Sequence, residues 1–516
     1  MRARALGKML VGSLIATAAA RYPHRQAFLC GTTGRSLTFR ETNYRSNKLA
    51  HGLMNLGLVK GDVAAFLCSN RLEIPEIYFA LAKSGIVGVP LNYRLAAAEL
   101  VELVHAMGAK ALLYEERFAD RAADIQVHFP GIMHFVQIGG SAPALGLGYE
   151  ELLGQSSGDE PEVDIDEADP YYFNLTSGTT GLPKSYVLTQ FNSATAAPFG
   201  LAFDLTRRDV VMTAFPMFGR VGTVWMMVSV VFGIPNVLVN FEPSTVLRLI
   251  QSERVTIVNL VPTMGAMLLA CDALPNTNLS SLRAIVFAGS MLPEQIREQS
   301  AAKLTGDIYE YYGMQETGLL AYSTPEDRRL QPDSVGRAAL FAEVRVVGPD
   351  GRAMPAGEIG EIIGRSPSAV TAYFQSPTKS EETFREGWVH TGDLGSLDSD
   401  GFLFIRGRVK DMIITGGQNV HSAEVEAVLL TFPGVADCAV IGLPHELWGE
   451  AVTAIVVPSP NTEIHLDSLQ QYCRERLAGF KTPKCIHIQL TALPRTPTGK
   501  VQKFLLVEQY GGKKET

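Results

Sequence analysis

The chain has 516 residues, of which 46% are apolar and 19% charged, so it can build a large core and is neither disordered nor collagen-like. Lys and Arg number 45 against 53 Asp and Glu, and the net charge of −8 argues against a nucleic-acid binder. Six cysteines stand singly, without a CxxC pair, which argues against zinc or disulfides and favours a reducing, cytosolic compartment.

The N-terminal sequence MRARALGKMLVGSLIATAAARYP resembles a secretory signal, with basic residues before an apolar, Ala-rich stretch. The alternative is an amphipathic helix that ends at Tyr22-Pro23. Leu10, Leu14 and Ala18 share one face of such a helix. We favour the helix, because nothing downstream is typical of a secreted protein.

Short apolar runs alternate with helical patterns, which predicts mainly parallel sheets with helices on both faces. The expected strands are 63–68, 111–114, 134–138, 210–215, 236–240, 257–261 and 284–289. A helix is expected to end at Gly108, and its apolar face comprises Leu100, Leu103, Val104 and Met107.

Residues 221–241 carry no charge and are numerous enough to span a bilayer. Gly233, Pro235 and Asn236 interrupt the segment, however. We therefore predict a buried helix, a turn and a buried strand, and no membrane span.

The residue composition and the predicted secondary structure change in the last third of the chain. Residues 345–411 are dense in Gly, Pro and Asp, which predicts short strands in an antiparallel or barrel-like unit. A small α+β pattern begins at Met412. From Arg474 onward, nine Lys or Arg stand against three Glu, which indicates either a solvated face or a surface that meets phosphates.

The strongest local feature is LTSGTTGLPKS at 175–185, directly after the expected strand YYFNLT. Glycines let backbone N–H groups approach phosphate oxygens, hydroxyls add donors, and Lys184 adds a positive charge. Pro183 stands where GxxxxGK has its second glycine, so an ordinary P-loop is disfavoured. Taken alone, the segment could also be a surface turn.

The string TSGTTGLPK (176–184) resembles the phosphate loop of the adenylate-forming superfamily, which includes acyl- and aryl-CoA synthetases. Six further motifs follow in that superfamily's order: FPMFGRVG (215–222), AGS (288–290), YYGMQETG (311–318), GWVHTGDLG (387–395), GRVKDMIITGGQNV (407–420) and LPRTPTGK (493–500). The resemblance implies an α/β fold. Residues 1–409 would form stacked, mostly parallel sheets plus a barrel-like part, and residues 410–516 a mobile α+β domain hinged at Lys410.

The implied reaction joins a small-molecule carboxylic acid to coenzyme A with ATP and Mg²⁺. The carboxylate attacks the α-phosphate to give acyl-AMP and pyrophosphate, and the thiol then displaces AMP. Two alternatives stay open: a ligase that loads a carrier-protein thiol, and a nucleotide-binding pseudo-ligase. Dimers are common in the superfamily, so a homodimer also stays open.

By resemblance, the loop would hold the β- and γ-phosphates through Thr176, Ser177, Gly178, Thr179, Thr180, Gly181 and Lys184. Thr176 would also take part in catalysis. Glu316 matches the acid that helps to hold Mg²⁺. Tyr312 and Gly313 match the residues beside the adenine, and Ala288, Gly289 and Ser290 those along the nucleotide and acyl pocket.

Asp393 matches the acceptor of the ribose hydroxyls, with Arg408 as its partner near the hinge residue Lys410. Lys500 matches the lysine that bridges the acyl carboxylate and the α-phosphate. Gly416 and Gly417 match the loop that turns inward for the thiol step.

The sequence departs from the superfamily in three places. Ser185 and Gln190 stand where Gly and His are common after the loop lysine. Gly219 replaces a common histidine, and Arg220 follows it; we favour a solvent-facing Arg220 over one that meets a second substrate carboxylate. Gln315 replaces the usual Thr or Ser, although its amide can still donate to the α-phosphate.

The expected acyl pocket comprises Phe218, Gly219, Arg220, Val261, Met264, Met314 and Gly318. Residues 219–227 contain no acid that would hold a substrate ammonium. We therefore expect an aryl, alicyclic or short- to medium-chain acid without an amine.

Overall fold

A computed structural model describes residues 7–176, 184–195, 197–460, 462–495 and 501–511. The chain divides into two compact units, each with its own core. Unit 1 comprises Met1–Asp327, Ala339–Glu343 and Arg365–Val389, and unit 2 comprises Arg328–Ala338, Val344–Gly364 and His390–Thr516. The boundary expected at Lys410 lies inside unit 2 and stays a prediction.

Unit 1 contains two large sheets. The first has the order β7-β6-β5-β3-β4-β8-β9, and its strands are β3 (Val63–Leu67), β4 (Val87–Pro90), β5 (Ala109–Glu115), β6 (His134–Ile138), β7 (Leu147–Gly148), β8 (Pro170–Thr176) and β9 (Lys184–Thr189). Its pairs are parallel except that β8 and β9 run antiparallel. The strands predicted at 63–68, 111–114 and 134–138 are confirmed.

The second sheet of unit 1 has the order β15-β14-β13-β12-β10-β11-β1-β2. Its strands are β1 (Gln26–Cys30), β2 (Ser36–Thr38), β10 (Val211–Thr213), β11 (Asn236–Leu238), β12 (Ile257–Leu260), β13 (Ala284–Phe287), β14 (Asp307–Met314) and β15 (Gly318–Ser323). The pairs from β14 to β1 are parallel, as predicted, and only the flanking hairpins are antiparallel.

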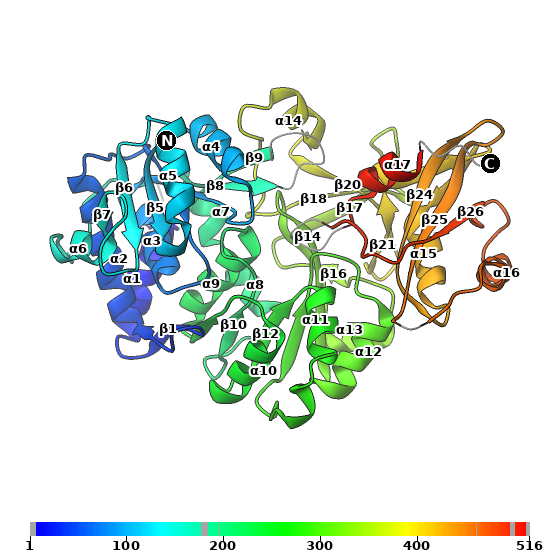
Figure 1. The fold of residues 1–516 in the computed structure, drawn as a ribbon, viewed down its shortest axis with the longest axis horizontal. Coiled ribbons are helices and arrows are strands. Elements are labelled where there is room, and N and C mark those ends of the chain that lie inside the picture. The colour runs from blue at the N-terminus through cyan, green and yellow to red at the C-terminus, as the bar shows by residue number, and fades with distance from the viewer. Residues whose placement is uncertain (1–6, 177–183, 196, 461, 496–500, 512–516) are drawn as a thin grey trace. The chain divides into compact units, whose positions relative to one another are not determined.

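Helices cover both faces of these sheets, because successive strand residues point to opposite sides. Val211 of β10 belongs to a core that contains residues of both sheets, here called the inner core. The next residue, Met212, belongs to a separate core, here called the outer core. The inner core takes α1 (Val11–Arg21), α2 (Phe39–Asn55), α3 (Glu73–Ser84) and α9 (Arg220–Phe232). Figure 1 shows α10 (Pro243–Ser252), α11 (Pro262–Leu269) and α12 (Glu294–Lys303) flanking the second sheet, and α4 (Ala97–Ala106) and α5 (Ala119–His128) pack on the first.

Both segments that imitate membrane signals belong to the core. In α1, Val11, Ile15 and Ala18 are buried, which confirms an amphipathic helix. Of the predicted apolar face only Ala18 is buried, because Leu10 precedes the helix as its N-cap residue and Leu14 is half-buried. Residues 221–241 form most of α9, a left-handed turn at Gly233, and β11, also as predicted. Within the described ranges, no helix is long and apolar enough to cross a membrane.

The remaining elements include a separate sheet and a small α+β part. The separate sheet contains β17 (Glu343–Val347), β18 (Gly360–Arg365), β19 (Phe384–Arg385), β20 (Trp388–Leu397) and β21 (Leu403–Arg408), and β20 pairs antiparallel with β19 and β21. In unit 2, two cores cover the faces of β22 (Met412–Thr415), β23 (Gln418–His421), β24 (Val435–His445), β25 (Gly449–Pro458) and β26 (Cys485–Ile488). The helices there are α15 (Ser422–Leu430), α16 (Leu466–Arg476) and α17 (Lys503–Gly511).

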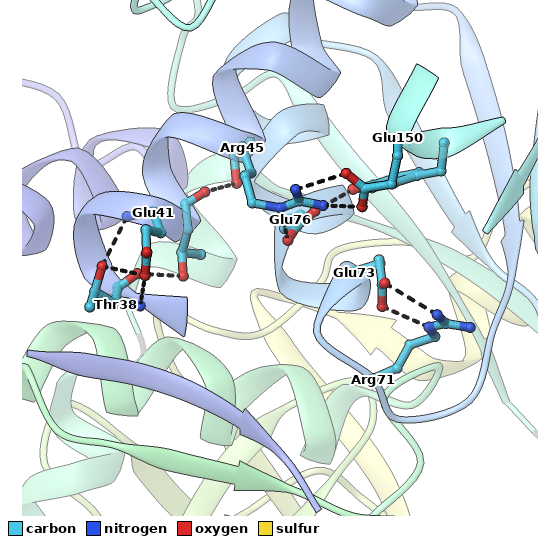
Figure 2. A network of polar contacts seen from close by, with 10 residues as sticks. Thr38, Glu41, Arg45, Arg71, Glu73, Glu76 and Glu150 are labelled. Carbon is cyan, nitrogen blue, oxygen red and sulfur yellow. Dashed lines mark hydrogen bonds and ion pairs between the residues drawn. The ribbon is translucent and has the colours of Figure 1, made fainter. Parts of the chain in front are cut away.

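Short elements complete the chain: α6 (Tyr149–Gly154), α7 (Gln190–Ala194), α8 (Ala197–Leu201), α13 (Pro325–Leu330), α14 (Pro377–Thr383), β16 (Arg337–Ala338), η1 (Glu116–Phe118), η2 (Leu274–Asn276) and η3 (Val409–Asp411). Helix α2 begins with a capping box, in which Thr38 Oγ1 accepts from the Glu41 N–H and the Glu41 carboxylate accepts from the Thr38 N–H (Figure 2).

A charged network then ties α2 to α3 and α6 (Figure 2). Arg45 Nε donates to Glu76 Oε1 at 2.6 Å, and its Nη2 donates to Glu150 Oε1 at 2.6 Å. Tyr149 Oη donates to Glu76 Oε2, also at 2.6 Å. Burial raises the pKa of Glu76 to about 7, against the opposing effect of Arg45.

Arg45→Met would leave Glu76 buried with Tyr149 as its remaining partner, and we expect the free energy of unfolding at pH 8 to fall by about 3–5 kcal/mol. The folded-state pKa of Glu76 lies above the ordinary value of 4.5. The stability that this raised pKa contributes to the folded state is therefore fully present below pH 4.5 and is lost as pH rises through about 7. The loss should therefore be smaller at pH 6. Urea denaturation measures both values.

Glu150→Gln is the matched control, because it removes the exposed half of the same arginine's interactions. We expect it to cost less than about 1 kcal/mol. Equal losses for the two variants would show that burial of Glu76 does not decide the energetics of this network.

Candidate active site

The predicted phosphate loop connects two antiparallel strands of the first sheet. Thr176 ends β8 and Lys184 begins β9, and the two residues lie opposite each other in the register. The loop residues Ser177, Gly178, Thr179, Thr180 and Gly181, and also Lys500, lie outside the described residues.

The second sheet brings the other nucleotide and acyl motifs of unit 1 to one edge. Strand β10 has β11 on one side and β12 on the other, so the strand order reverses there. Ligands of open parallel sheets bind at the carboxyl ends of strands near such a reversal. Phe218, Gly219 and Arg220 follow the end of β10, and Val261 and Met264 follow β12. Ala288, Gly289 and Ser290 follow β13, and Met314 ends β14.

Several of these residues lie in close contact. The backbone of Gly289 has φ +90°, and a Cβ placed on it would lie 3.2 Å from Val261 Cγ1. The Phe218 ring packs edge-on against Tyr93 with centroids 5.3 Å apart. Gly219 is the N-cap residue of α9, and the nearest atom to a Cβ there, Pro216 O, is 3.5 Å away. A side chain would therefore fit at Gly219, and its absence leaves space.

The hairpin of β14 and β15 carries Gln315 and Glu316 in its turn, and Tyr312 and Gly313 in the preceding strand. Met314 lies opposite Gly318, and the register shifts between Tyr312 and Gly313. A Cβ on Gly313 would lie 2.0 Å from the carbonyl oxygen of Gly318, which no real Cβ tolerates. Gly313 is thus needed for the close approach of the two strands.

Glu316 is buried in unit 1, with 6% of its surface exposed. Tyr373 Oη donates to Glu316 Oε1 at 2.8 Å, and the Val370 N–H donates to the Glu316 carbonyl at 2.9 Å. Burial, and next the Glu316 carboxylate, raise the pKa of Tyr373, so the phenol stays a donor.

The donor chemistry at Glu316 suits Mg²⁺. Within the described part of the chain, no donor reaches Glu316 Oε2, and no group of three His, Cys, Asp or Glu could hold a metal by itself. Mg²⁺ is usually held by one or two carboxylates together with waters and substrate phosphates. A single buried carboxylate with one open oxygen fits that mode of binding.

Gln315 is held by two buried side chains of the first sheet. Asn174 Nδ2 donates to Gln315 Oε1 at 2.8 Å, and Tyr186 Oη donates to the Gln315 carbonyl at 2.8 Å. Tyr186 also lies 3.2 Å from Oε1. Because these donors require an oxygen at Oε1, they fix the amide orientation and leave Nε2 to donate elsewhere.

The solvent-facing interpretation of Arg220 is wrong. The residue is only 4% exposed, and its guanidinium donates to the carbonyl oxygens of Gln315 and Ser368. Position 220 is the first residue of α9, so the side chain extends from the helix start into the unit rather than away from it.

In unit 2, the predicted ribose-binding pair is in contact. Asp393 on β20 faces Arg408 on β21, and Arg408 Nε lies 2.9 Å from Asp393 Oδ1. Asp393 is 6% exposed. Thr391 Oγ1 donates to the Ile362 carbonyl and accepts from the Asp393 N–H, which fixes this part of the strand.

The predicted thiol loop is the turn between β22 and β23. Gly416 and Gly417 have φ +57° and +76°, which favour glycine. A Cβ on Gly416 would also lie 3.1 Å from the Trp448 ring, and the Gly416 N–H donates to the Trp448 carbonyl at 2.7 Å. Lys410 lies in the short helix η3, just before β22.

Sequence reasoning missed the side chains that support the turn at Gln315 and Glu316: Asn174, Tyr186 and Tyr373. Asn174 stands two residues before the phosphate loop motif, which was a usable signal. Tyr186 and Tyr373 lie far from Gln315 and Glu316 in the sequence, and no spacing links them.

Two family models match the chain: AMP-binding enzyme over residues 15–374, and AMP-binding enzyme C-terminal domain over residues 424–500. This chain belongs to the AMP-binding enzyme family. The resemblance inferred from the motifs, the predicted fold class and the expectation of an enzyme are thereby confirmed.

Relatives cover almost the whole chain. The long-chain-fatty-acid–CoA ligase FadD13 of Mycobacterium tuberculosis is 35% identical over 97% of this chain and 98% of its own length. The fatty acid–[acyl-carrier-protein] ligase ScoC of Streptomyces coeruleorubidus is 33% identical over 95% and 94%. The solved structure of Bacillus subtilis o-succinylbenzoate CoA synthetase with ATP and magnesium ion matches with a TM-score of 0.84 and 30% identity, over 96% of this chain and 98% of that one.

Gly313→Ala tests the geometry of the β14–β15 turn. The clash with the Gly318 carbonyl cannot be relieved by a side chain, so we expect a loss near the upper end of the roughly 1–3 kcal/mol typical of overpacking. Gly306→Ala is the matched control, because no atom lies within 4 Å of a Cβ there. Thermal unfolding of both variants measures the difference, and equal stability would contradict the contact.

Proposed function

We propose that this enzyme is an ATP-dependent carboxylate–CoA ligase. It would convert a carboxylic acid to its acyl-adenylate with release of pyrophosphate, and then transfer the acyl group to coenzyme A. The observation that carries the proposal is the match along 97% of the chain to a CoA ligase, with both family models in sequence order.

The described residues support the adenylation step. Both halves of the reaction move negative charge, so fixed donors and cations stabilise it most effectively. Glu316 would hold Mg²⁺ together with the phosphates, which brings a positive charge to the polyphosphate. Gln315 Nε2, oriented by Asn174 and Tyr186, would donate to the α-phosphate. The loop residues and Lys184 would hold the other phosphates.

The remaining roles follow the motifs. Tyr312 would pack beside the adenine, Asp393 would accept from the ribose hydroxyls, and Arg408 would fix that carboxylate through their ion pair. Gly416 and Gly417 would line the approach of the thiol. Lys410 would act as the hinge of a C-terminal domain that begins there.

The acid is proposed to be an aryl, alicyclic or short- to medium-chain monocarboxylate. Phe218, Val261, Met264 and Met314 supply an apolar wall, and Gly219 leaves space beside it. Both terminal nitrogens of Arg220 already donate to carbonyls, so this residue is not positioned to bind a second substrate carboxylate.

The six cysteines all lie in the described part of the chain and none of them forms a disulfide, which supports a reducing, cytosolic site of action. A homodimer remains a prediction.

The decisive test is a pyrophosphate-release assay with ATP, Mg²⁺ and a panel of acids, each with and without CoA. We expect pyrophosphate with aryl or short- to medium-chain acids and thioester once CoA is added. Pyrophosphate without CoA thioester would favour a carrier-protein acceptor, a second candidate that the similarity to ScoC supports. No pyrophosphate with any acid would favour a pseudo-ligase, and activity confined to long chains would overturn the substrate class.

Lys500→Ala should separate the two half-reactions. Lys500 is proposed to bridge the acyl carboxylate and the α-phosphate, and loss of one positioned cation costs on the order of 3 kcal/mol, or about 100-fold in rate. We expect that loss in adenylation, whereas thioester formation from supplied acyl-adenylate should be largely spared. Equal losses in both steps would contradict the assigned role.

Tyr373→Phe should weaken the response to Mg²⁺. The variant removes the hydrogen bond that orients Glu316 Oε1, and such supporting bonds change metal affinity by about tenfold or more. The Mg²⁺ concentration for half-maximal pyrophosphate release should rise accordingly. Tyr309→Phe is the control, because that hydroxyl bonds Asp204 near the start of β14. A rise shared by both variants would count against the specific role of Tyr373.

A further inference from the structure

Arg220 links two segments of unit 1 that enclose the proposed metal ligand. One terminal nitrogen donates to the carbonyl of Gln315, the residue before Glu316, and the other donates to the carbonyl of Ser368. A guanidinium presents these donors in a rigid planar fork. The fork therefore restrains the distance between the two carbonyls.

The segment that carries Ser368 contacts the same turn at two further points. Ser366 Oγ donates to the Thr317 carbonyl at 2.7 Å, and the Val370 N–H donates to the Glu316 carbonyl at 2.9 Å. Residues 366–370 thus lie along the backbone of 315–317. Arg220, at the start of α9, connects these two backbone segments.

The charge of Arg220 is held without a carboxylate partner. No Asp or Glu among the residues that the structure describes forms an ion pair with it, although it is only 4% exposed. Two backbone carbonyls accept its hydrogen bonds instead, which is costly unless the geometry is well satisfied. A buried cation in this arrangement gains stability only while both carbonyls stay in place.

We propose that Arg220 is a positioning residue for adenylation, which fixes the backbone of Gln315 and Glu316 by clamping the carbonyls of Gln315 and Ser368. The Gln315 amide and the Glu316 carboxylate then keep their orientation toward the α-phosphate and the metal. This inference rests on the proposed function. Arg220 would act through these two residues, because both of its terminal nitrogens are engaged by backbone carbonyls.

Three variants test the clamp. Arg220→Met removes both donors, Arg220→Lys retains the charge and can reach one carbonyl, and Tyr186→Phe removes another hydroxyl that donates to the Gln315 carbonyl. Arg283→Met is a stringent control. Arg283 also donates to two carbonyls and in addition forms an ion pair with Asp209, so its loss should destabilise the unit at least as much. It lies just before β13, however, at the amino ends of the strands.

The kinetic measurement is acid-dependent ATP–pyrophosphate exchange. We expect kcat to fall about 100-fold in Arg220→Met and about tenfold in Tyr186→Phe, because small displacements of positioned groups cost this much. KM for the acid should stay within about threefold, and Arg220→Lys should regain at least about tenfold of the lost rate. Unchanged kcat, or a loss confined to KM for the acid, would overturn the proposal.

The structural measurement is hydrogen–deuterium exchange, which does not depend on activity. Arg220→Met should speed exchange in residues 311–320 and 366–374 and leave residues 63–68 unchanged, whereas Arg283→Met should leave 311–320 unchanged. Unaltered exchange at 311–320 would overturn the clamp even in an inactive protein. If the wild-type chain releases no pyrophosphate with any acid, the proposed function fails, and the exchange data still decide the role of Arg220.

Discussion

The parallel pairing of β10, β12, β13 and β14 sends four strand ends to one edge of a sheet, and most of the site in unit 1 is built from the residues that follow them. Parallel strands are joined by crossover connections, usually helices, and the burial of these helices against the sheet stabilises each connection. The apolar cores on both faces of the sheet therefore fix the strand ends, and with them the spacing of motifs that lie up to about a hundred residues apart.

Within that frame, the turn at Gln315 and Glu316 depends on buried polar groups rather than on apolar packing. Asn174, Tyr186 and Tyr373 each place one donor on this turn. A buried donor or acceptor without a partner is costly, so each of these bonds restricts the position of the others. The arrangement leaves Glu316 Oε2 and Gln315 Nε2 as the groups that can turn to a ligand, which matches their proposed roles.

Much of the architecture could be predicted from residue pattern. The alternation of short apolar runs and helical segments anticipated the parallel sheets, and Gly233 with Pro235 correctly separated α9 from β11. The ordered motifs predicted Glu316, Asp393 and Arg408 as site residues, and the structure buries both acids and pairs Asp393 with Arg408. The error concerned Arg220: we expected a solvent-facing side chain, whereas the fold supplies two carbonyl acceptors that let it be buried.

The sequence by itself determined the fold class, the family and the order of the chemical motifs, because these depend on local periodicity and on short strings of residues. Only the tertiary structure decided which side chains hold the turn of β14 and β15, and where Arg220 points. Those contacts join residues such as Asn174 and Gln315, which are distant along the chain. Their pairing follows from the sheet order and from the demand that buried polar groups be hydrogen-bonded, and neither condition is written in any local stretch of sequence.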